Sequence, residues 1–295
     1  MPKFNKFLMS KEVDLAYKIS MKNIFTLLLL LTALFSNAQR TMFGAQNNYV
    51  APVLPIQTPP TTINNTSGLV LYLDASNPLS YSGSGTTWLD ISGSNNHIYW
   101  STPSPQFIID NGIKVIKTTN AINPLRAMAS TTYNNLPLGN SPYTAIAFFK
   151  PNTTTAPRFL LSVGPGDNSC GGTQIHPLCI GAGGKYSGGS CGGLGTWSNS
   201  SGVTPATTSY VFVATTFGNS TEKIYVNGNL DKSASLTNNI PNTAANKVCI
   251  GWVRDDGTGV NMDANIALIL FFNRELSASE ISQIYNDNKA KYNIN

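Results

Sequence analysis

The glutamates of this sequence are too scattered for catalysis by a pair of carboxylates on one strand. Such a pair occupies alternate strand positions, which holds the acid and the nucleophile about 5–5.5 Å apart. The chain contains four glutamates, Glu12, Glu222, Glu275 and Glu280, and no two of them alternate along a predicted strand. Glu275 and Glu280 flank a predicted helix start, where capping and the helix dipole account for acidic residues. We therefore do not expect paired-carboxylate chemistry.

Clustered oxygen ligands make the segment from residue 255 to residue 263 the best candidate for a metal site. Asp255, Asp256, Asn261 and Asp263 supply carboxylate and amide oxygens within it. Carboxylates this close repel one another unless water separates them or a cation bridges them, and calcium prefers oxygen ligands. A solvated loop is the simpler interpretation, and a calcium site formed by Asp255, Asp256 and Asp263 is the alternative. The sequence requires no other cofactor.

The run from Asp90 to Asn96 offers a second set of oxygen ligands. Asp90, Ser92 and Asn95 resemble a calcium-binding loop in composition. The same residue types close turns by accepting hydrogen bonds from their own backbone. We favour the turn.

Two aromatic residues in a Gly/Ser-rich stretch are candidates for stacking against a sugar. Sugar rings pack their C–H faces on exposed aromatic rings, and their hydroxyl groups need polar partners. Trp197 and Tyr186 lie where little core-forming sequence surrounds them. Asp255, Asp256 and Asn261 could supply the polar groups. Trp88 is predicted to be core, whereas Trp100 and Trp252 fit either a core or a cleft.

The four cysteines are predicted to form disulfides. Cys170, Cys179, Cys191 and Cys249 all follow a predicted signal peptide, and an even count in an oxidising compartment favours disulfides over a metal site. Three pairings are open. We prefer Cys170 with Cys191, which leaves Cys179 with Cys249.

The N-terminal region reads as an export signal followed by a tether. A basic start at Met21, an apolar run from Ile24 to Phe35 and the small residues up to Ala38 are typical of a cleaved signal peptide, so residues 1–38 are predicted to be upstream extension and signal. The Pro/Thr/Asn-rich residues 39–66 predict an extended tether, and the folded domain is expected at 67–295. We expect a secreted or cell-surface protein without a membrane span once the signal is removed.

Charge excludes nucleic acid as a partner. Residues 1–38 hold five lysines and two acidic residues, which leaves 14 basic and 12 acidic residues in the rest of the chain. No Lys/Arg cluster remains to form a binding surface for phosphates. With 41% apolar and only 11% charged residues, the chain predicts a folded domain with many turns.

The predicted elements are short strands and a single helix. Ten runs rich in β-branched and aromatic residues alternate with turn residues, which is typical of a β-sandwich or barrel. Asn227-Gly228 predicts a two-residue hairpin turn. Ser277 and Glu280 predict a capping box, flanked by a hydrophobic staple of Leu276 and Ile281. We expect this helix against the edge of the sandwich. The strand runs are 69–74, 97–100, 106–109, 113–117, 143–150, 159–163, 210–216, 223–226, 247–253 and 266–272.

Three of these segments resemble the laminin-G-like domain, a concanavalin A-like lectin/glucanase jelly roll of secreted bacterial proteins. They are the opening LVLYLDASNP at 69–78 with TWLDISG at 87–93, the hairpin KIYVNG at 223–228, and the closing 265–281. The resemblance covers about residues 67–292 and implies an all-β jelly-roll sandwich with one C-terminal helix. Relatives include carbohydrate-binding modules, adhesive domains and glycoside hydrolases, so fold alone does not select a function.

Two functions from different classes follow. The first is a secreted, non-catalytic module that binds a glycan or cell-surface polysaccharide, or serves adhesion. The second is a divergent polysaccharide hydrolase or lyase. Where many relatives carry an acidic residue on the penultimate strand, this chain has Leu268, which favours the non-catalytic module.

Overall fold

Short antiparallel strands make up most of the folded unit, as the sequence predicts. The computed structural model describes residues 61–100, 106–119, 133–155, 158–164, 171–181, 183–188, 190–192, 199–235, 247–251 and 262–294. The strands of the larger sheet are β1 (Leu69–Asp74), β4 (Gln106–Asp110), β5 (Ile113–Lys117), β6 (Tyr143–Pro151), β12 (Val211–Gly218), β13 (Thr221–Val226), β14 (Asn229–Ser235) and β16 (Ala264–Phe272). Those of the smaller sheet are β7 (Arg158–Gly164), β8 (Gly171–Ile180), β9 (Tyr186–Gly188), β10 (Ser190–Gly192), β11 (Asn199–Ser200) and β15 (Lys247–Ile250). A ribbon of β2 (Thr87–Trp88) and β3 (Ile98–Tyr99), the helix α2 (Ala278–Asn288) and the 3-10 turn η1 (Lys289–Tyr292) complete the elements.

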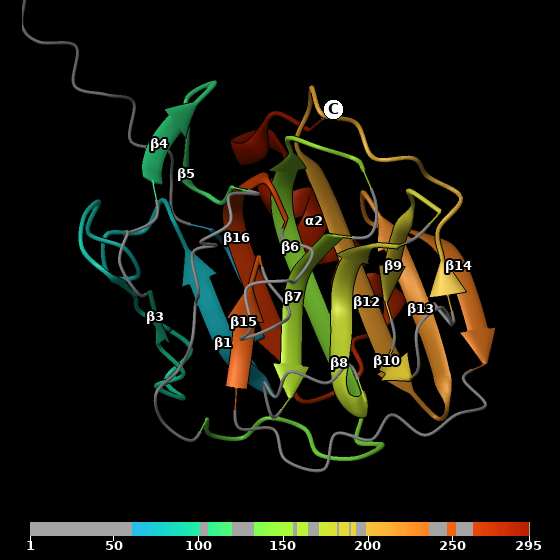
Figure 1. Cartoon of the computed structure of the whole chain (residues 1–295). Helices are drawn as coiled ribbons and strands as arrows, with labels where there is room; N and C mark the ends of the chain where they lie inside the picture. Colours follow the sequence, from blue (N-terminus) through green and yellow to red (C-terminus); the bar gives the residue numbers. More distant parts are fainter. Residues whose placement is uncertain are drawn as a thin grey trace, which may run out of the picture. The chain divides into compact units, whose positions relative to one another are not determined.

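The two sheets pack face to face as a β-sandwich (Figure 1). The larger sheet has the order β14-β13-β12-β6-β16-β5-β4, with β1 also paired to β16. The smaller sheet has the order β11-β9-β8-β7-β15, with β10 paired to β8. Apolar residues of both sheets, among them Ala147, Ile269, Leu161 and Leu178, form one buried core between them. The predicted all-β jelly-roll sandwich with a short C-terminal helix is confirmed.

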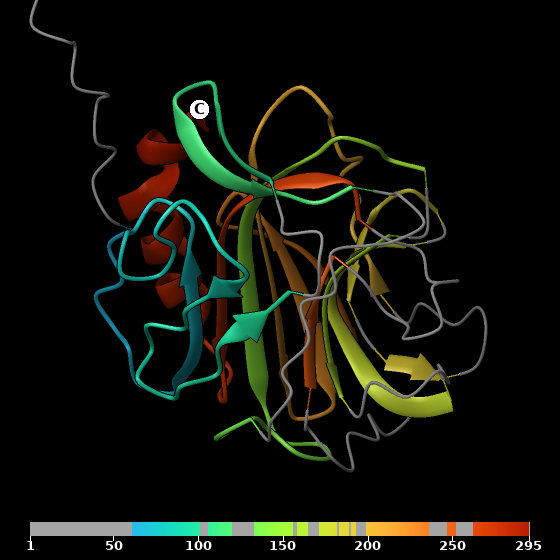
Figure 2. The same ribbon diagram turned by 60° about the vertical axis from the view of Figure 1, so that its left-hand side comes forward.

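A second apolar layer lies on the outer face of the larger sheet. Phe148 and Phe212 of that sheet pack against Tyr285 of α2 and Tyr292 of η1. The curled β4–β5 hairpin adds Ile113 and Val115 to the same layer, beside the helix (Figure 2). The expectation that the helix lies at the sandwich edge is therefore wrong. Both faces of the central strands are apolar, so the outer face needs a cover of its own.

Local hydrogen bonding fixes the start of the helix as predicted. The Ser277 side chain accepts from the backbone N–H of Glu280, and the Glu280 carboxylate accepts from the backbone N–H of Ser277. Leu276 and Ile281, the predicted staple, are both buried. Ile281, Ile284 and Tyr285 face the sheet. None of the helices in the described residues is long and apolar enough to cross a membrane.

The Asn227-Gly228 turn joins β13 to β14 with φ of 48° and 78°, the positive values that a type I′ hairpin requires. Asn111-Gly112 forms an equivalent turn between β4 and β5. Thr61 is buried, and its hydroxyl donates to Asp74. The folded unit therefore includes a residue that lies six positions before the predicted start of the domain at residue 67.

Candidate functional site

The structure removes Tyr186 from the predicted sugar-stacking surface. Its side chain is 2% exposed and meets the ring of Phe149 edge-on at 6.1 Å between centroids. Burial raises the pKa of its hydroxyl. The residue belongs to β9, whose pairing with Ile180 turns the ring into the core. The Gly/Ser-rich sequence around it indicated a loop, so this prediction is wrong.

Trp197, the other predicted platform, lies outside the described residues. The segment that carries it connects β10 to β11. Those two strands pair with β8 and β9, so the connection begins and ends at one edge of the smaller sheet. Trp197 stays a prediction.

The candidate calcium segment is described only at its two ends. Gly251 and Met262 face each other there, with the N–H of Met262 donating to the carbonyl of Gly251 at 3.0 Å. The Thr118 hydroxyl donates to the carbonyl of Met262 at 2.7 Å. Asp255, Asp256 and Asn261 lie outside the described residues. The two ends of the connection that carries them are therefore held together by a hydrogen bond, just after β15 and just before β16.

Asp263, the described member of this set, is bound to protein groups. Its carboxylate accepts from the Asn152 amide at 2.8 Å, and the same amide donates to Asn265 at 3.2 Å. In the part of the chain that the structure describes, no three His, Cys, Asp or Glu side chains gather to hold a metal. Calcium binding at this segment stays a prediction.

A neighbouring carboxylate fastens the β4–β5 hairpin to the larger sheet. Asp110 accepts from the Tyr210 hydroxyl at 2.8 Å and from the Asn265 amide at 2.7 Å, and it pairs with Lys150. Partial burial alone would raise the pKa of Asp110, but the hydrogen bonds from Lys150, Asn265 and Tyr210 hold it below its usual value. The Asp110 carboxylate therefore has a structural role, which is to hold the β4–β5 hairpin against the larger sheet.

Cys179 and Cys249 are buried thiols and do not pair with each other. They lie on β8 and β15, which flank β7 on opposite sides. Two strand spacings come to about 9–10 Å, beyond the roughly 7 Å that separates the Cα atoms of bonded cysteines at most. The predicted Cys179–Cys249 bond is therefore wrong. Cys170 and the side chain of Cys191 lie outside the description, so the Cys170–Cys191 bond stays a prediction.

Asp90 closes a turn, as we favoured. Its carboxylate accepts from the backbone N–H groups of Tyr72, Ser92 and Asn96 at 2.8–2.9 Å and from the Ser92 hydroxyl at 2.9 Å. The backbone N–H of Asp90 donates to His97 Nδ1 at 3.0 Å. This network fixes the loop that connects β2 to β3.

The β2–β3 ribbon presents an exposed aromatic face that the sequence analysis missed. Trp88 and Ile98 point into the core, and Tyr99 on the opposite face is 40% exposed. The neighbouring Leu89 is 41% exposed, and the His97 ring meets Tyr99 edge-on at 6.4 Å. Trp88 and Trp100 stack at 5.9 Å beneath, which confirms the prediction for Trp88 and places Trp100 in the core.

The loop that leads into β3 carries exposed amides and is bonded to another one. Asn95 is exposed in the turn before β3. Asn134 is exposed too, and its side chain donates to the carbonyl of Ser94 at 2.9 Å. The buried Asn96 amide donates to the carbonyl of Asn134 at 3.0 Å, which joins the two loops. An exposed ring and exposed amide groups are the kinds of side chain that a sugar requires.

Each glutamate in the described residues has a structural contact. Glu275 pairs with Lys223 at 2.7 Å, and Glu280 pairs with Arg274 at 2.7 Å while capping α2. Glu222 is completely buried, and its carboxylate lies against Gly188 of the facing sheet. Burial of the nearby Tyr143 hydroxyl raises its pKa, and the charge of Glu222 raises it further.

A family profile described as the concanavalin A-like lectin/glucanases superfamily, of the laminin-G type, matches residues 127–282. This range is more than half of the chain and includes β6, β12, β13 and β16 of the larger sheet. The chain belongs to this family. No curated protein matches its sequence.

Solved structures share the fold of this laminin-G-type chain at low sequence identity. A Trypanosoma rangeli sialidase matches 78% of the chain with a TM-score of 0.51 at 15% identity, and the match spans 34% of the sialidase. Domain 4 of the extracellular arabinanase AbnA from Geobacillus stearothermophilus, solved with arabinotriose, matches 74% of the chain with a TM-score of 0.50 at 13% identity. That match covers 98% of the arabinanase domain, whereas the chain spans about a third of the sialidase.

Proposed function

We propose that the protein is a non-catalytic module that binds a glycan or serves adhesion outside the cell. The observation that carries the proposal is the exposed Tyr99 ring on the β2–β3 ribbon, whose preceding loop carries the exposed Asn95 and is bonded to the exposed Asn134. Trp197, which lies in the sequence between β10 and β11, is the second candidate platform. A predicted signal peptide and tether would place both outside the cell.

The contacts of the glutamates support binding over hydrolysis. An acid and a nucleophile need an open position between two carboxyl groups. Glu275 and Glu280 are each held by a cation, and Glu222 is enclosed between the sheets. A hydrolase of this fold would have to use aspartates instead, and Asp74, Asp90 and Asp110 are each bound by several protein donors.

The decisive experiment is a glycan array probed with the secreted protein, with and without calcium. Arabinotriose belongs in the array, because a domain of similar fold from an arabinanase was solved with it. Binding to a glycan without release of reducing ends supports the proposal. Release of reducing ends that is lost in aspartate-to-asparagine variants would establish the polysaccharide hydrolase instead.

Single substitutions then locate the site. Loss of a stacking ring should cost roughly 1 kcal/mol or more of binding free energy, so we expect Tyr99→Ala or Trp197→Ala to weaken binding about fivefold or more. Tyr186→Phe is the matched control, since its buried ring keeps its packing. Titration calorimetry with the best glycan gives the comparison. If both alanine variants bind as tightly as the parent, the sugar does not use these rings.

A further inference from the structure

Asp74 and Lys291 form a buried ion pair between the end of β1 and the turn η1. Lys291 Nζ lies 3.2 Å from Asp74 Oδ2, and the two side chains are 5% and 0% exposed. Burial lowers the pKa of the Lys291 amine, and the nearby charge of Asp74 offsets part of this effect. A desolvated lysine loses its proton more readily than a solvated one, which makes its amine a better nucleophile.

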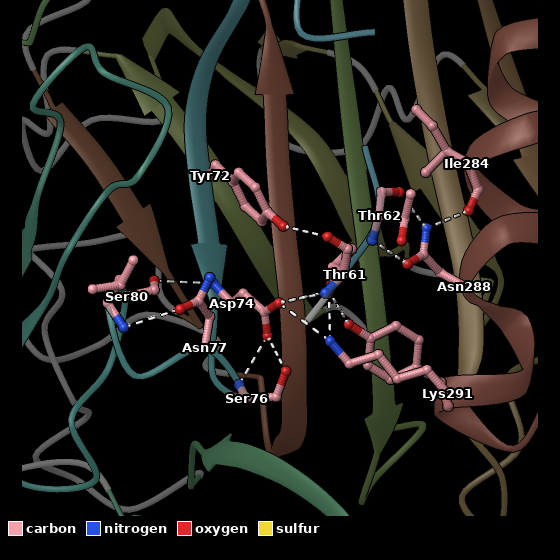
Figure 3. Close-up of polar contacts among 12 residues, drawn as sticks. Thr61, Thr62, Tyr72, Asp74, Ser76, Asn77, Ser80, Ile284, Asn288 and Lys291 are labelled. Carbon is pink, nitrogen blue, oxygen red and sulfur yellow. Dashed lines mark hydrogen bonds and ion pairs between the residues drawn. The ribbon is translucent and has the colours of Figure 1, made fainter. Parts of the chain in front are cut away.

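The Thr61 hydroxyl bridges the two members of this ion pair. It accepts from Lys291 Nζ at 2.7 Å and donates to Asp74 Oδ2 at 2.6 Å. Because a hydroxyl has one hydrogen, Thr61 must accept at its 2.8 Å contact with the Tyr292 hydroxyl. Figure 3 shows Thr61 against the ends of the Asp74 and Lys291 side chains. A proton of the amine can therefore reach Asp74 Oδ2 through a single oxygen atom.

The second carboxylate oxygen of Asp74 faces two donors of one residue. Oδ1 accepts from the backbone N–H of Ser76 at 2.8 Å and from the Ser76 hydroxyl at 2.6 Å. When an amine attacks a carboxyl carbon, negative charge collects on the oxygen that remains, and fixed donors stabilise that charge. The Asp74 carboxyl thus has these donors on one oxygen and the Thr61 hydroxyl on the other.

Contacts of the backbone hold the Thr61 hydroxyl in this position. The carbonyl of Thr61 accepts from the Tyr72 hydroxyl at 3.0 Å, and its N–H donates to Asp74 Oδ2 at 3.3 Å. Asn288, which is 1% exposed, accepts from the N–H of Thr62 and donates to its carbonyl, both at 2.9 Å. Amine, hydroxyl and carboxyl are therefore positioned before any reaction between them.

We propose that the Lys291 amine and the Asp74 carboxyl condense to a side-chain amide that joins β1 to η1. Thr61 Oγ1 passes a proton from Nζ to Oδ2, and the lone pair of the neutral amine attacks Cγ of Asp74. The N–Cγ bond forms and the Cγ–Oδ2 bond breaks. Oδ2 leaves as water with two protons from the ammonium group, so the reaction needs no oxidant and no further reactant.

The buried setting favours the amide over the ion pair. Burying two charges costs desolvation free energy that a neutral amide avoids. In the product, Oδ1 keeps both Ser76 donors, and the new N–H donates to the Thr61 hydroxyl in place of the ammonium group. Reacting groups held in contact reach an effective concentration of about 10⁵ M or more, which opposes the reverse attack by water.

An amide at this place would change how the fold carries a mechanical load. Asp74 ends the first strand and Lys291 lies in η1, after the last helix, so the bond closes a covalent loop over residues 74–291. A pull applied at residues 61 and 294 would pass through the amide, and the strands within the loop would carry none of it. This consequence rests on the proposed adhesive function, whereas formation of the bond does not.

Mass spectrometry of the full-length chain tests the bond. The chain is made by cell-free synthesis, folded, and reduced before measurement so that disulfides do not contribute. We expect an intact mass below that of the sequence by one water molecule. After digestion, we expect a branched peptide in which the segment with Asp74 is joined to Lys291. Neither result depends on a glycan, so failure to bind any glycan would leave the bond unaffected.

Two controls accompany this measurement. Lys291→Arg keeps the positive charge but has no nucleophilic amine, so this variant should have the full mass. Lys223 and Glu275 are a control within the same chain, because their ion pair is shorter, at 2.7 Å, but partly exposed. Their peptides should stay separate.

Thr61→Val removes the hydroxyl and keeps the shape of the side chain. Proton transfer by a positioned group contributes roughly 100-fold or more, so we expect the branched peptide to accumulate about 100-fold more slowly in this variant. Thr61→Ser, which retains the hydroxyl, should react as the parent does. Samples taken at intervals after synthesis give the rates, and tryptophan fluorescence reports that each variant is folded.

The folded parent alone decides whether the bond exists. Recovery of Asp74 and Lys291 only in separate peptides would overturn the proposal. The same loss of water in Lys291→Arg, or joining of Lys223 to Glu275 at a similar yield, would overturn it too, because the reaction would then not depend on the buried pair. Accumulation in Thr61→Val at the parent rate would refute the role of the Thr61 hydroxyl.

Discussion

The sequence predicts the burial of a side chain only where residues close to it in the chain determine that burial. The Asp90 turn was predictable because its donors, Ser92 and Asn96, are a few residues away. Tyr99 lies between the buried Ile98 and Trp100, so strand alternation could have identified its exposed ring. Tyr186 carried no such signal, because its burial depends on pairing with β8 and on the facing sheet.

The ionisation of a single residue, Glu280, should make the stability of the fold depend on pH. The hydrogen bond from Arg274 lowers the pKa of its carboxyl from 4.5 to about 2, with help from Ser277. A lowered pKa contributes stability above pH 4.5 that is lost as the pH falls towards 2. Because Glu280 is partly exposed and solvent screens its ion pair, we expect a loss of only about 1 kcal/mol across that window.

Chemical denaturation at several pH values measures this loss. In Glu280→Gln the part of the acid dependence that this carboxyl contributes should disappear. Glu275→Gln is the matched control, since Glu275 also pairs with a cation but does not cap the helix. Equal acid sensitivity of the parent and Glu280→Gln would contradict the assignment.

At the scale of elements, the features coded within a few residues were predictable. The capping box and the Asn227-Gly228 turn depend on local hydrogen bonds and φ angles, and both are confirmed. The smaller sheet was predictable only in part. β9, β10 and β11 are short and rich in Gly and Ser, and they exist as strands only through pairing with β8 and with each other.

The two Asn-Gly hairpins allow a matched test of how a turn meets the helix. Gly228 has φ of +78°, and a Cβ there would lie 2.6 Å from the Tyr285 ring. Gly112 has φ of +82° with nothing within 4 Å. Left-handed backbone costs an alanine about 1–3 kcal/mol at either site, and only Gly228→Ala adds a clash with α2.

We therefore expect Gly228→Ala to lower the free energy of unfolding more than Gly112→Ala does. Urea denaturation followed by tryptophan fluorescence compares the two. Equal losses would mean that the Tyr285 ring moves aside freely and that the hairpin does not position the helix.

At the scale of the whole molecule, the sandwich was predictable, but the arrangement of its outer layers was not. Ten strand patterns and the resemblance of three segments fixed the fold class. The place of α2 on a sheet face and the binding of residues 61–65 arise from contacts between residues far apart in the sequence, such as Tyr285 with Phe212 and Thr61 with Lys291. No periodic pattern encodes such contacts.

The state of the cysteines is also a property of the whole fold. Cys179 and Cys249 are separated by β7 and remain thiols. Cys170 lies outside the described residues, so its predicted bond to Cys191 stays a prediction.

We therefore expect two reactive thiols per chain in the secreted protein when it is denatured without reduction, and four after reduction. The Cys170–Cys191 bond would close the Gly-rich segment between β8 and β10, as an oxidising compartment favours. Titration with a thiol reagent gives the count, and peptide mapping identifies the bonded pair; Cys170→Ser with Cys191→Ser should leave the unreduced count at two. Four thiols before reduction would refute the disulfide. None would mean that Cys179 and Cys249 are oxidised as well, which the strand order opposes.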